Sequence, residues 1–120
     1  MKNPDIRRDP AASNEVRRCV IGGQRRERAA PLQVEPDAIT FATLSSLAAV
    51  LSDENRSLLR LLHELRPSSL TELSEHSGRR VPSLSRTLRM MEGYGLVELK
   101  RVGASVRPNA VATRFIVELD

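Results

Sequence analysis

The chain has 120 residues, 40% of them hydrophobic and 2% aromatic, which predicts one small domain with an aliphatic core and excludes a two-domain enzyme. Its one cysteine, Cys19, excludes an intrachain disulfide framework and a zinc site of several cysteines, and no apolar run reaches the ~18 residues of a membrane span. The formal net charge is +4, and the start lacks the apolar stretch of a signal peptide, so we expect a soluble, cytoplasmic protein without a cofactor.

Residues 1–36 are predicted to form a flexible, basic N-terminal arm. They contain several prolines, eight basic and five acidic residues, and no helical period. Within them, Val16 to Ile21 could make a short strand. A chain that starts near Pro36 is expected to fold, and the arm is expected to order on DNA phosphates or on a protein partner. The folded domain is predicted to span residues 37–120.

The pattern of residues 37–95 predicts a short strand, Ile39 to Phe41, followed by four helices. Thr43 and Ser52 are expected N-caps, and Ser69 with Glu72 forms the pattern of a capping box. Pro67, Gly78 and Gly95 are expected to end helices, and Pro82 suits the first turn of the fourth helix. The inward stripes at helical spacing are Leu44, Leu47, Ala48 and Leu51; Leu58, Leu61, Leu62 and Leu65; Leu70 and Leu73; and Leu84, Leu88 and Met91.

A strand is predicted directly after the fourth helix, from Leu96 to Arg101, followed by a turn at residues 102–105. Residues 106–119 are expected to return as extended chain interrupted by Pro108. The order of helices, turn, helix and hairpin is that of a winged helix-turn-helix. The predicted fold class is therefore mainly α with a small β-hairpin, plus the flexible N-terminal arm.

Residues 38–120 also resemble a known group of proteins. The stretches LTELSEHSGR, SLSRTLRMMEGYGLVEL and RFIVELD are similar to those of MarR-like winged-helix DNA-binding proteins of bacteria and archaea. They look closest to a group of regulators of which some are antitoxins encoded beside toxin genes. The resemblance implies operator binding as a dimer. It departs at residues 108–112, where such proteins usually carry a more regular return strand.

Positive charge is concentrated in residues 79–107, which hold seven basic and two acidic residues, whereas residues 37–78 hold three and six. Such a focused field points to a polyanionic partner. The helix face opposite the stripe of Leu84, Leu88 and Met91 would enter a major groove, where Ser83 and Arg86 would read bases. The candidate DNA-binding residues are Arg79, Arg80, Ser83, Ser85, Arg86, Arg89, Lys100, Arg101 and Arg107.

These observations predict a sequence-specific regulator that binds double-stranded DNA as a homodimer and represses its own operon. The main alternative is an antitoxin that also binds a toxin protein. A winged helix that serves only as a protein scaffold has no need of groove-facing arginines, and no catalytic set supports an enzyme. Three segments are candidates for the dimer surface: the first helix, residues 39–41 and residues 114–119.

Overall fold

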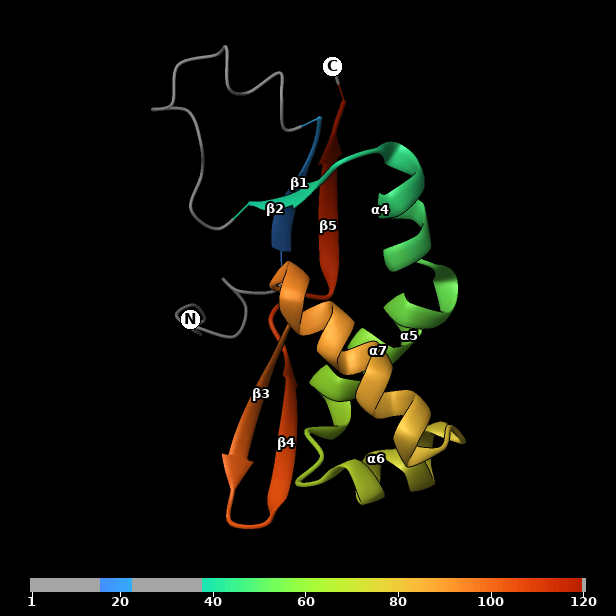
Figure 1. Ribbon diagram of the computed structural model, residues 1–120, viewed down its shortest axis with the longest axis vertical. Helices are drawn as coiled ribbons and strands as arrows, with labels where there is room; N and C mark the ends of the chain where they lie inside the picture. Colours follow the sequence, from blue (N-terminus) through green and yellow to red (C-terminus); the bar gives the residue numbers. More distant parts are fainter. Residues whose placement is uncertain (1–15, 23–37, 120) are drawn as a thin grey trace, which may run out of the picture. The chain divides into compact units, whose positions relative to one another are not determined.

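The computed structural model describes residues 16–22 and 38–119 (Figure 1). Its strands form two sheets, a three-stranded one with the order β2-β1-β5 and a two-stranded one of β3 and β4. The chain divides into two compact units: Val50–Thr113, and the segments before and after it. The elements are β1 (Val16–Ile21), β2 (Ile39–Phe41), α4 (Leu44–Val50), α5 (Asp53–Leu65), α6 (Leu70–Ser77), α7 (Val81–Tyr94), β3 (Val97–Val102), β4 (Ser105–Ala110) and β5 (Arg114–Glu118).

Local caps fix the starts of α4 and α5, as predicted. The backbone N–H of Ser46 donates to Thr43 Oγ1 over 3.0 Å at the start of α4, and that of Asn55 donates to Ser52 Oγ over 3.2 Å at the start of α5. Helix α5 ends at Leu65, and its C-cap Arg66 adopts a left-handed φ of 52° directly before Pro67. These hydrogen bonds satisfy amides that have no partner within the helix.

The capping box of α6 differs in one bond from the expected pattern. The Glu72 amide donates to Ser69 Oγ over 3.1 Å, as predicted. The Glu72 carboxylate, however, accepts from the backbone N–H and the hydroxyl of Ser68, both over 2.9 Å, and not from Ser69. These two donors hold the pKa of the Glu72 carboxyl below its usual range, because they favour its charged form.

The inward faces of the first two helices are shifted from the predicted stripes. In α4, Leu44 is 50% exposed and Ala48 is exposed, whereas Leu47 and Val50 are buried, as is Leu51. In α5 the buried residues are Leu58, Leu59 and Leu62. The stripes of α6 and α7 are buried at Leu73 and at Leu84, Leu88 and Met91. The helical period predicts that a helix has an apolar face. Which residues of that face are buried depends on the elements that pack against it.

The hairpin follows α7 after Gly95, which adopts a left-handed φ of 84°. Strand β3 pairs antiparallel with β4, with Val97 opposite Ala110 and Val102 opposite Ser105. Pro108 does not interrupt the return strand, because it lies buried inside β4 opposite Leu99. Each strand of a two-stranded sheet has one open edge, where a residue without an N–H is tolerated. Packing of α7 on β3 and of α5 and α6 on β4 completes a winged helix-turn-helix.

The three-stranded sheet is the feature that the sequence did not predict. Strand β1 lies in its centre and pairs in parallel with both β2 and β5, so that Cys19 stands beside Ile39 and Val117. The strand expected at Val16–Ile21 is confirmed, and it is paired on both sides. Most of the rest of the expected arm, residues 1–15 and 23–36, lies outside the described residues. The domain boundary near residue 36 stays a prediction. The observed fold contains a parallel sheet in addition to the predicted helices and hairpin.

Because β1 bridges β2 and β5, a chain that starts at residue 37 should lose the hydrogen-bonded ladder on which both neighbours depend. We expect amide hydrogen exchange at β5 to accelerate strongly in this chain, while α7 amides stay protected. A chain that starts at residue 15 keeps β1 and is the matched control. Equal protection of β5 in both truncated chains would contradict the central role of β1.

Candidate nucleic-acid interface

Helix α7 divides into a buried and an exposed face with the phase that the sequence predicts. Leu84, Leu88 and Met91 are at most 1% exposed. Arg86 and Arg89 are not buried with them and lie on the other side of the helix. Ser83 and Ser85 are half-buried at the margins of this face. The outer face of α7 therefore presents arginines, as the helical period indicates.

The two arginines before α7 are placed differently from each other. Arg80 is exposed at the N-cap position of α7 and makes no side-chain capping hydrogen bond. Arg79 is half-buried, and its Nη2 donates to the backbone carbonyl of Glu54 at the start of α5 over 3.2 Å. Its own carbonyl accepts from the hydroxyl of Ser74 over 2.6 Å. Arg79 therefore ties the turn between α6 and α7 to α5, a structural role that no sequence signal indicates.

The cations of the hairpin point to two different sides of it. In the β3–β4 register Lys100 stands opposite Arg107, and Arg101 stands opposite Val106. Because neighbours along a strand point to opposite faces, Arg101 lies on the other face from Lys100. Arg101 lines a hollow of about 250 Å³ between the hairpin and the helices, together with Ser85 and Arg89 of α7. Three predicted site residues from two elements thus meet in one place.

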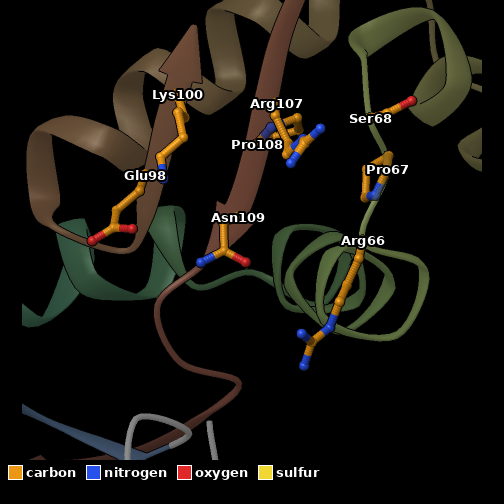
Figure 2. A pocket seen from close by; sticks show the side chains of 8 residues that line it. All are labelled: Arg66, Pro67, Ser68, Glu98, Lys100, Arg107, Pro108 and Asn109. Carbon is orange, nitrogen blue, oxygen red and sulfur yellow. The ribbon is translucent and has the colours of Figure 1, made fainter. Parts of the chain in front are cut away.

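Lys100 and Arg107 line a second hollow, of about 460 Å³, between the hairpin and the segment that joins α5 to α6 (Figure 2). Figure 2 shows Arg107 extending from β4 toward the segment that carries Pro67 and Ser68. Arg66 and Glu98 also line this hollow, and Figure 2 shows the carboxylate of Glu98 pointing away from Arg107. Sequence reasoning did not single out Arg66, because it precedes the basic stretch by more than ten residues.

Five cations of this region differ from Arg79 in having no side-chain partner in the described part of the chain. Within the part of the chain that the structure describes, no hydrogen bond or ion pair engages the side chains of Arg86, Arg89, Lys100, Arg101 or Arg107. Residues 79–107 carry only two acidic side chains against seven basic ones. An anion that reaches these guanidinium and ammonium groups breaks no hydrogen bond or ion pair with a described residue, which favours binding to a polyanion.

Other candidate groups offer little chemistry. Cys19 is 0% exposed in the centre of the β2-β1-β5 sheet, and burial raises the pKa of its thiol, which disfavours the reactive thiolate. Among residues 16–22 and 38–119, no three His, Cys, Asp or Glu side chains gather to hold a metal ion. None of the helices described here combines the length and the apolar character that crossing a membrane requires.

The residues from α5 to β4 define the class of this domain as a winged helix-turn-helix. The chain belongs to the HVO_A0114 family, whose profile matches residues 50–117 and so covers this whole unit. Among solved structures, the chain is similar to a crystal structure described as the predicted DNA-binding transcriptional regulator from E. coli. The two share 21% identity over 55% of this chain and 70% of the other, with a TM-score of 0.47. No curated protein matches the chain.

Proposed function

We propose that this protein is a sequence-specific transcriptional regulator that binds double-stranded DNA and acts in the cytoplasm as a homodimeric repressor of its own operon. One observation carries the proposal. Helix α7 presents Arg86 and Arg89, both without a partner among the described residues, on the side opposite its buried stripe. A helix of this kind fits a major groove, where arginine can donate two hydrogen bonds to guanine.

The candidate residues divide by role in this proposal. Arg86 and Ser83 read base edges from α7. The DNA backbone beside the groove is contacted by the predicted site residues that line one hollow between α7 and the hairpin, which are Ser85, Arg89 and Arg101. The remaining cations contact phosphates and set the position of the protein on the duplex. They are Arg79, whose guanidinium also binds the Glu54 carbonyl, Arg80, Lys100 and Arg107.

A second candidate function, supported by the MarR-like resemblance, is that of an antitoxin that binds a toxin protein and represses the operon of the pair. The apolar residues Ile116, Val117 and Leu119 are exposed and offer a surface for a protein partner. On this interpretation DNA binding by α7 is unchanged, and the toxin is an additional ligand.

The experiment is a genome-wide pull-down of DNA with the full chain, followed by binding to a recovered site and to a scrambled duplex. We expect a limited set of sites and tighter binding to the recovered sequence. Arg101→Gln should flatten the slope of log affinity against log salt by about 0.9 for each phosphate that is no longer neutralised. Arg60→Gln is the matched control, because Arg60 is an exposed arginine on α5 outside residues 79–107.

Two results would overturn the proposal. One is recovery of DNA without any enriched sequence together with equal binding to the recovered and scrambled duplexes. The other is an equal loss of salt dependence in Arg101→Gln and Arg60→Gln. It would mean that DNA affinity depends on the net charge of the protein and not on the position of each arginine.

A further inference from the structure

We propose that β5 pairs antiparallel with β5 of a second copy of this chain, so that the two three-stranded sheets join into one continuous sheet. The two-fold axis of this dimer passes beside Ile116. The inference deepens the proposed homodimer, on which it rests, by naming the surface, the register and the partner.

The first observation is an unpaired sheet edge. Among the described strands the order β2-β1-β5 leaves one side of β5 without a neighbour. An edge strand presents a row of free N–H and C=O groups that another strand can use. The opposite edge, β2, has only three residues, of which Ile39 and Phe41 are buried. The five-residue strand β5 is the longer and more accessible edge.

The second observation is apolar exposure along β5. Ile116 is 55% exposed and Val117 is 41% exposed. In the β1–β5 register Val117 stands beside Cys19, which is buried, and Ile116 stands beside Arg18, which is exposed. Val117 therefore lies on the same face of the sheet as the buried Cys19, called here the covered face, although at the open edge it is itself 41% exposed. Ile116 lies on the opposite, outer face. An exposed isoleucine in the middle of an open edge gains from burial against a second copy.

The third observation is that the strand complements itself in charge. Arg114 and Glu118 lie on the outer face at equal distances along the strand from Ile116. In an antiparallel pair centred on Ile116, Arg114 stands opposite Glu118 of the second copy, and the symmetry repeats this pair. Ile116 then faces its own counterpart, and Phe115 faces Val117 of the second copy on the covered face. Cross-strand pairs of this kind stabilise a sheet.

Other registers lose these matches. A shift by one residue sets covered-face residues opposite outer-face residues, because the side chains alternate. A shift by two removes the pair of Arg114 with Glu118 and sets one of these charged residues opposite Ile116. Within the described residues Arg114 makes no ion pair, and Glu118 is bound to Arg18. A carboxylate accepts several hydrogen bonds, so Glu118 can bind Arg18 and Arg114 of the second copy together.

The test uses the symmetry at Ile116. Residues directly opposite in an antiparallel pair have Cα atoms about 4.5–5.5 Å apart, which suits a disulfide. We expect the full chain with Ile116→Cys to form a covalent dimer under mild oxidation. Leu119→Cys is the matched control, because Leu119 is 57% exposed but lies far from its own counterpart in this register. Wild-type protein should not cross-link, because Cys19 is 0% exposed.

A second measurement uses charge and needs no cysteine. Arg114→Glu should raise the dissociation constant of the dimer about tenfold in analytical ultracentrifugation, since two attractive pairs become repulsive. Glu118→Arg alone should do the same. A mixture of the two variants should recover the dimer, because every glutamate at position 114 or 118 of one variant then faces an arginine of the other. Circular dichroism checks that both variants are folded.

Several results would overturn the interface: a monomeric wild-type chain, equal cross-linking at positions 116 and 119, or no recovery on mixing folded variants. These outcomes are separate from those of the DNA experiment. A cross-linked Ile116→Cys dimer that binds no specific DNA would remove the proposed function and leave the interface. A chain that binds its site as a monomer would remove the interface and leave the DNA-binding helix.

Discussion

Leu88→Ala is expected to lower the free energy of unfolding by about 2–5 kcal/mol. Leu88 is 1% exposed and lies on α7 between the buried side chains of Leu84 and Met91. Truncation removes the burial of several methyl and methylene groups and leaves a cavity that the rigid helix cannot close. Denaturant unfolding followed by circular dichroism gives the change directly.

Arg89→Ala is the control for this prediction, one residue further along the same helix. Arg89 lies outside the buried stripe and makes no hydrogen bond or ion pair with a described residue, so its loss should change stability by less than about 0.5 kcal/mol. The same variant should weaken DNA binding. Comparable losses of stability in the two variants would mean that the assigned faces of α7 are wrong.

Arg86→Ala is expected to weaken binding to the specific DNA site by about 1–3 kcal/mol. Arg86 lies on the outer face of α7, and its guanidinium is free of partners among the described residues. An arginine that bridges two acceptors of one guanine loses both hydrogen bonds on truncation. Preference at that base pair should relax, whereas preference elsewhere in the site should remain.

The measurement compares the variant and the wild type on the specific duplex, on duplexes with single base changes and on a scrambled duplex, all at one salt concentration. Arg60→Ala again serves as the matched control, because it removes an equal charge from another helix. If Arg86→Ala binds all of these duplexes as the wild type does, Arg86 does not read the sequence.

Local sequence signals were sufficient for the parts of the fold that depend on residues near each other. Caps at Thr43, Ser52 and Ser69 act within three residues, and each hydroxyl accepts the amide hydrogen bond expected of an N-cap. The buried stripe of α7 and the turn of the hairpin likewise depend on residues that are close together in the sequence. The outer face of α7 could therefore be named from its helical period, because a helix repeats within one short segment.

Only the tertiary structure decided the features that join distant segments. Strand β1 pairs with β5, and the ion pair between Arg18 and Glu118 joins residues that are 100 positions apart. Neither segment contains a periodic pattern that indicates which strand it pairs with. The bond from Arg79 to the Glu54 carbonyl likewise depends on how two helices pack. Period and capping are set by neighbours along the chain, whereas the choice of strand partner is set by which distant surfaces bury each other best.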